Sequence, residues 1–181
     1  MVLSLYPPNL NRMRKSIEIK DVIITDTVGI YSFRFEDSSQ TEFEKFMLKY
    51  KNAKDKLIKD DFNRIIKAID KISTSEEGAV ERLFRTNERK MSDSVVAIPL
   101  DTLRRRNHDT LRLYCVRLSD RILIIGNGAT KRGSYNSNPD IVKYTNDLAN
   151  IERAIKYFVR KNKIVLDYNE IIIDNSVDIR I

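Results

Sequence analysis

The chain has 181 residues, of which 41% are hydrophobic and 33% charged, and its formal net charge is +7. This composition suits one soluble globular domain, and no window holds the ~18 continuous apolar residues that a membrane span requires. A single cysteine, Cys115, excludes an internal disulfide framework and fits a reducing compartment. The first residues lack the pattern of a signal peptide, so we predict a cytoplasmic protein.

The N-terminal third of the chain predicts an arm and two strands. Residues 1–15 include two adjacent prolines and are expected to form a loosely held arm. Residues 16–25 alternate apolar and polar side chains and predict an edge strand. Residues 30–36 predict a second strand. Its expected core face consists of Tyr31, Phe33 and Phe35.

Two amphipathic helices are expected next. Thr41 and Glu44 have the spacing of a capping box, which predicts the start of the first helix. The apolar side of that helix comprises Phe43, Phe46, Met47, Tyr50 and Leu57. Asp60-Asp61 predicts the N-cap of a second helix. Its apolar stripe comprises Phe62, Ile65, Ile66, Ile69 and Ile72, so each helix should bury one side.

A β-hairpin dominates the centre of the chain. Residues 94–100 predict a strand, and the runs 111–118 and 121–125 predict a hairpin around a turn at Ser119-Asp120. We interpret Gly126–Gly128, which follows the second run, as another turn.

The C-terminal part predicts one helix and one strand. Asn138-Pro139-Asp140 has the residue types of a helix start. The apolar positions of this helix are Ile141, Tyr144, Leu148, Ile151, Ile155 and Phe158, at alternating spacings of three and four. Residues 163–173 predict a final strand, followed by a short polar tail.

This order of elements predicts an α+β fold, in which an antiparallel sheet has its helices packed on one face. The expected core order is β-α-α-β-β-β, followed by a C-terminal helix and strand. We divide the chain into an N-terminal arm and edge strand (1–29) and a single domain (30–181), whose core is 30–132 and whose C-terminal extension is 133–181. Alternation directs Leu111, Leu113 and Cys115 toward the helices. Arg112 and Tyr114 are therefore expected on the open face.

The positive charge is concentrated between Arg82 and Arg132. This window holds 12 Lys and Arg residues but five Asp and Glu residues, so it carries the whole net charge of +7. Such a patch favours a polyanion or an acidic protein segment as partner, although a solvated surface without a partner would have the same composition. The residues expected to contact nucleic acid are Arg85, Arg89, Arg104, Arg105, Arg106, His108 and Tyr114.

Most enzyme motifs are absent from the sequence, including the P-loop, the dinucleotide fingerprint and the nucleophile elbow. His108 is the only histidine, which excludes a site with two imidazoles, and we predict neither a metal site nor a cofactor. Arginine matches phosphate bidentately and tyrosine can stack on a base, so the open face predicts a single-stranded RNA surface. Alternatively, Arg112 and Tyr114 are ordinary strand residues that pack across neighbouring strands and bind no ligand.

Two short motifs add a family resemblance. The expected β-α-α-β-β-β order, with Arg112-Leu113-Tyr114 on the third strand and the Gly-x-x-Lys-Arg motif of 128–132 after the fourth, resembles the RelE/HigB-like toxin superfamily. The resemblance covers roughly residues 30–132. It implies the toxin of a type II toxin–antitoxin pair, a ribosome-dependent mRNA endonuclease that cleaves by 2′-hydroxyl attack.

The resemblance also implies roles and partners. Arg112 would stabilise the developing phosphorane charge, and Lys131 or Arg132 would lie at the scissile phosphate. The implied partners are messenger RNA, the ribosome and an antitoxin with an acidic segment or a helix-turn-helix domain. Two other hypotheses use the same basic face: a non-catalytic nucleic-acid-binding protein, and a gyrase-directed toxin on the same fold.

Overall fold

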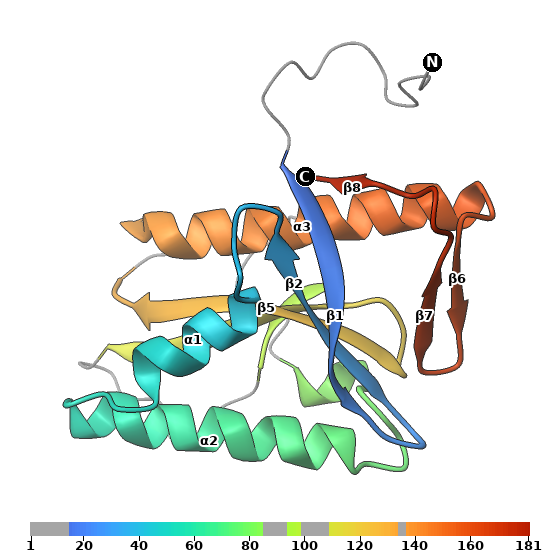
Figure 1. The fold of residues 1–181 in the computed structure, drawn as a ribbon. Coiled ribbons are helices and arrows are strands. Elements are labelled where there is room, and N and C mark those ends of the chain that lie inside the picture. Colours follow the sequence, from blue (N-terminus) through green and yellow to red (C-terminus); the bar gives the residue numbers. More distant parts are fainter. Residues whose placement is uncertain (1–14, 85–93, 99–108, 134–136) are drawn as a thin grey trace.

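The computed structural model describes residues 15–84, 94–98, 109–133 and 137–181. Its main sheet lies between helices, with α3 on one side and α1 and α2 on the other (Figure 1). The strands are β1 (Ser16–Ile24), β2 (Gly29–Phe35), β3 (Val95–Ala97), β4 (Thr110–Arg117), β5 (Ile122–Lys131), β6 (Ile164–Asp167), β7 (Glu170–Ile173) and β8 (Ile179–Arg180). The helices are α1 (Glu42–Tyr50), α2 (Lys56–Ser73) and α3 (Pro139–Arg160), with a 3₁₀ turn, η1, at Glu81–Leu83.

The six-stranded sheet has the order β3-β4-β5-β2-β1-β8. Neighbouring strands are antiparallel except β2 and β5, which run parallel. The predicted α+β class is confirmed, whereas the expectation of a purely antiparallel sheet was wrong. The parallel pair arises because β5 returns along β4 and then pairs with β2, a strand that precedes both α1 and α2 in the chain. β1 is not an edge strand along its whole length, since β8 pairs with Ser16 and Ile17.

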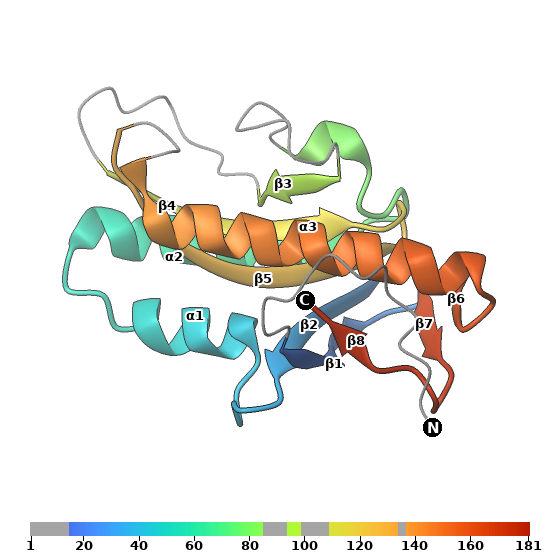
Figure 2. The ribbon, with the colours of Figure 1, turned by 90° about the horizontal axis from the view of Figure 1, so that it is seen from above.

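Both faces of the sheet are covered, which corrects the expectation of helices on one face. α1 and α2 bury one core, which includes Phe46, Phe62, Ile65, Leu111, Leu113 and Cys115. α3 buries a second core, which includes Tyr31, Phe33, Tyr114, Leu148, Ile151 and Ile155. The view from above shows α3 lying across β4 and β5 (Figure 2). The apolar stripe of α3 must be buried against something, and this face of the sheet receives it.

The helical hairpin begins as predicted and turns at a different point. Thr41 Oγ1 accepts a hydrogen bond from Glu44 N at 3.1 Å, and Thr41 N donates to the Glu44 carboxylate at 2.7 Å, so the capping box is confirmed. α1 ends at Tyr50, and Asp55 is the N-cap of α2. The predicted N-cap at Asp60-Asp61 was wrong. The carboxylate of Asp61 is buried and accepts a hydrogen bond from Leu111 N at 3.1 Å, which ties α2 to the start of β4.

The central hairpin turns at Ser119-Asp120 as predicted, but β5 is longer than expected. Gly126–Gly128 lies inside β5 and is not a turn. Gly128 pairs with Leu113, and a Cβ atom at residue 128 would lie 2.0 Å from the carbonyl oxygen of Arg112. The glycine therefore permits a close approach of two strands.

Residues 163–173 form the hairpin β6–β7 instead of one strand. Tyr168 adopts a left-handed φ of 50° in the turn, where the polar pair Tyr168-Asn169 interrupts the apolar run. The Tyr31 hydroxyl holds this turn against the sheet: it donates to the Asn169 carbonyl at 3.0 Å and accepts from Ile171 N at 3.2 Å. The predicted polar tail supplies β8.

Candidate nucleic-acid interface

Lys131 and Arg132 lie where β5 ends beside the start of β4. Thr110 is the register partner of Lys131. The Arg132 guanidinium donates from Nε to the Asp109 carboxylate at 2.6 Å, and the Arg132 side chain is 78% exposed. This guanidinium therefore presents most of its N–H groups to solvent, where an anion can reach them.

The start of α3 fixes the backbone of Arg132. Asn138 Oδ1 accepts from Arg132 N at 3.1 Å, and Asn138 Nδ2 donates to the Arg132 carbonyl at 2.8 Å. Ser137 Oγ donates to the same carbonyl at 3.1 Å. Asn138 is the N-cap of α3 as predicted, although its side chain makes no capping hydrogen bond to the helix. It instead joins the end of β5 to the first turn of α3.

Arg112 and Tyr114 do not lie on an open surface, which corrects the main geometric expectation. Their exposed fractions are 7% and 2%. The alternation was right, because Leu111, Leu113 and Cys115 belong to the core under α1 and α2. The opposite face of β4 is covered by α3. Ile122–Ile125 signalled this outcome, since continuous apolar strands are typical of sheets buried on both sides.

The other two arginines of the central hairpin stabilise the fold. Arg117 Nε donates to the Ala79 carbonyl at 2.7 Å, and its guanidinium pairs with Asp120 at 2.6 Å. Arg121 donates to the carbonyls of Thr27 and Glu76 and stacks on the Tyr168 ring. Both lie at the hairpin turn, away from Lys131. Part of the basic window is therefore structural charge.

Six of the predicted contact residues lie outside the described residues: Arg85, Arg89, Arg104, Arg105, Arg106 and His108. The last four precede Asp109 in the sequence, and Asp109 is the ion-pair partner of Arg132.

A polar network between α1, β5 and α3 was not predicted from the sequence. Glu42 is buried at the start of α1, pairs with Lys45 at 2.6 Å and accepts from Asn127 Nδ2 at 2.8 Å. Asp147 on α3 pairs with Lys143 at 2.7 Å. Burial raises the pKa of the Asp147 carboxyl, the hydrogen bond from Lys143 opposes this rise, and the charge of Glu42 adds to it. The two ion pairs are local, whereas the hydrogen bond of Asn127 to Glu42 and the proximity of Glu42 to Asp147 join distant segments.

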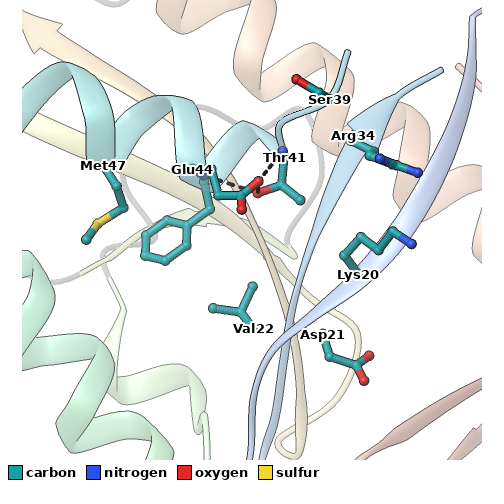
Figure 3. A pocket seen from close by; sticks show the side chains of 9 residues that line it. Lys20, Asp21, Val22, Arg34, Ser39, Thr41, Glu44 and Met47 are labelled. Atoms are coloured by element: carbon teal, nitrogen blue, oxygen red, sulfur yellow. Dashed lines mark hydrogen bonds between the residues drawn. The ribbon is translucent and has the colours of Figure 1, made fainter. Parts of the chain in front are cut away.

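A cleft of about 480 Å³ lies between α1 and strands β1 and β2 (Figure 3). Lys20 and Arg34 extend away from α1, and both pair with Glu18, whose pKa they lower. Glu44 on the opposite wall is held by Thr41. None of the described residues that line the cleft belongs to the predicted contact set. The cleft is therefore not where those residues meet.

Cys115 is buried, and burial raises the pKa of its thiol. We expect a thiol reagent such as DTNB to leave the native protein unlabelled and to modify one thiol per chain as guanidinium chloride unfolds it. The labelled fraction should follow the loss of circular dichroism. Rapid labelling of the native protein would contradict the buried, protonated state and reopen Cys115 as a reactive group.

Comparison with family models, curated proteins and solved structures found no match. Among the described residues, no helix combines the length and apolar character needed to cross a membrane. In the same part of the chain, no group of three or more His, Cys, Asp and Glu residues is arranged to hold a metal ion.

Proposed function

We propose that the chain is a RelE/HigB-like toxin of a type II toxin–antitoxin pair, which cleaves translated mRNA in the cytoplasm. The observation that carries this proposal is the placement of Lys131 and Arg132 beside Asp109, at one end of the sheet. The succession β2, α1, α2, β3, β4, β5 has the element order that the resemblance implies, whereas the parallel pairing of β2 with β5 departs from the antiparallel sheet that was expected. The arginine-rich segment that ends at His108 leads directly into this end of β4.

The proposed chemistry needs positioned cations. The 2′-hydroxyl loses its proton to water, and its oxygen bonds to the adjacent phosphorus to form a 2′,3′-cyclic phosphate. The bond between that phosphorus and the 5′-oxygen breaks, and the 5′-oxygen takes up a proton from water. Lys131 and Arg132 stabilise the negative charge that develops on the phosphate oxygens. Arginine stays protonated at every relevant pH, so Arg132 acts as an electrostatic clamp and not as the proton donor. The resemblance assigns the phosphorane charge to Arg112 as well, and the burial of Arg112 counts against that assignment.

The burial of Arg112 and Tyr114 favours a second candidate, RNA binding without cleavage. A buried arginine cannot form a bidentate contact with a phosphate unless α3 moves, and a buried tyrosine cannot stack on a base. This candidate keeps Lys131 and Arg132 as phosphate contacts and removes the catalytic step.

Controlled expression in a bacterial host tests the proposal. We expect the wild type to arrest growth and cut transcripts, and the double variant Lys131→Ala Arg132→Ala to lower cleavage by about 100-fold or more, since both charge-stabilising groups are lost. Lys67→Ala Lys71→Ala removes two exposed lysines of α2 and should leave toxicity unchanged. Harmless wild-type expression with intact transcripts would contradict the proposal. Chromosome breaks with intact transcripts would indicate a gyrase-directed toxin instead.

A further inference from the structure

Three lysines from distant parts of the chain converge on one aromatic ring. Lys15 precedes β1, Lys45 belongs to α1 and Lys143 to α3. Their ammonium nitrogens lie 5.9, 5.9 and 5.3 Å from the centroid of the Phe35 ring. No two of these nitrogens can therefore be more than about 12 Å apart. We call Lys15, Lys45 and Lys143 the lysine triad.

Each lysine of the triad has a carboxylate partner, and two of these partners lie below the surface. Lys45 pairs with Glu42 and Lys143 with Asp147, whose side chains are 5% and 17% exposed. Lys15 pairs with Asp37 at 2.5 Å, and both of these side chains are exposed. An ammonium group has three N–H donors, so each lysine can keep its carboxylate and still donate to a ligand. An approaching anion meets ammonium groups before it meets Glu42 or Asp147.

The triad and Arg132 are linked through the first turns of α3. Asn138 holds the backbone of Arg132, and Lys143 follows five residues later, about 8 Å along the helix axis. Phe35 ends β2 and Lys131 ends β5, the two parallel strands of the sheet. Because parallel strands share a direction, both groups lie toward the carboxyl ends of this pair. The two cationic positions can therefore contact one extended strand.

We propose that the lysine triad binds a phosphate group of the RNA strand whose neighbouring phosphates contact Lys131 and Arg132. This inference rests on the proposed function and adds a second phosphate-binding position on the α1–α3 side of the molecule. Lysine suits the task because it interacts with phosphate as a compact point charge. Exposed ion pairs such as Lys15–Asp37 contribute little stability, so their rearrangement around a phosphate costs little.

Fluorescence anisotropy of a labelled 12-nucleotide RNA with the purified full chain, repeated over a range of salt, tests the proposal. We expect Lys15→Gln Lys45→Gln Lys143→Gln to weaken binding by about tenfold or more at low salt. The slope of log Kd against log salt should fall by about 0.7, since the variant loses one phosphate contact and each such contact in a single strand contributes about that much. The control Lys54→Gln Lys67→Gln Lys71→Gln removes three exposed lysines of the α1–α2 hairpin and should bind nearly as the wild type does.

Two further measurements separate the possible failures. Lys15→Gln alone leaves Glu42 and Asp147 paired, so it tests the triad without leaving a buried charge unpaired. It should weaken RNA binding by a smaller factor than the triple variant does. If the triple variant and Lys15→Gln bind RNA as tightly as the wild type does, the lysine triad is not a phosphate site, and the proposed function is unaffected. If the wild type binds no free RNA, the triad is overturned as an RNA site, and the expression experiment alone decides the proposed function.

Discussion

Gly128→Ala should destabilise the protein by about 3 kcal/mol or more, because the new Cβ atom has no space between β4 and β5. It would lie 2.0 Å from the carbonyl oxygen of Arg112 and 2.9 Å from the Phe46 ring. A backbone carbonyl of a paired strand cannot move away without breaking the hydrogen bonds of that pair. Equilibrium unfolding in urea measures the loss in the free energy of unfolding, and the midpoint of the transition should move to a markedly lower urea concentration.

Gly126→Ala provides the matched control in the same strand. Its Cβ atom would meet only the side chain of Leu148 among its nearest neighbours, at 3.1 to 3.2 Å. A side chain can shift by a few tenths of an ångström, so we expect a cost of at most about 1 kcal/mol. Equal losses at the two glycines would show that the close contact between β4 and β5 is not what requires Gly128.

Ile155→Ala should cost about 2–5 kcal/mol, as much as Ile65→Ala on the other face of the sheet. Both side chains are fully buried in the cores on either face of the sheet, Ile155 on α3 and Ile65 on α2. Truncation of either removes apolar contacts and leaves a cavity that the sheet cannot close. Chemical unfolding monitored by circular dichroism gives both values on one scale.

The exposed residue Ile172 on β7 is the control for this comparison. Ile172→Ala makes the same chemical change at a position that is 48% exposed, and should cost less than about 1 kcal/mol. If Ile155→Ala matched Ile172→Ala, α3 would not be packed on the sheet, and the face that carries Arg112 and Tyr114 would be open as the alternation pattern alone suggests.

Local sequence patterns located most of the elements because their physical causes are local. The capping box of Thr41 and Glu44 involves backbone groups within one helical turn, and the stripe from Phe62 to Ile72 depends only on helical periodicity. The turn at Ser119-Asp120 and the start of α3 at Pro139 follow equally from nearby residues. Even the division of β4 into two faces was correct, since alternation is a property of a single strand.

Only part of the candidate interface could be predicted from local sequence patterns. The sequence singled out Lys131 and Arg132, and the structure adds their neighbours Asp109 and Asn138. It could not show that Arg117 and Arg121 are held by backbone carbonyls and a ring, because those contacts join segments up to 94 residues apart. The lysine triad was also invisible, since Lys15, Lys45 and Lys143 share no spacing and meet only around Phe35.

The sequence by itself determined the α+β class, the principal helices and the strands around the central turn. Only the tertiary structure decided which faces of the strands are buried and which strands are neighbours. The physical reason is that both depend on contacts between segments that are separate in the chain: β5 pairs with β2, about 90 residues away, and α3 packs back over β4 and β5. The β2–β5 pairing makes the sheet mixed and brings the ends of these two strands to the same side, and the packing of α3 buries the face that carries Arg112 and Tyr114.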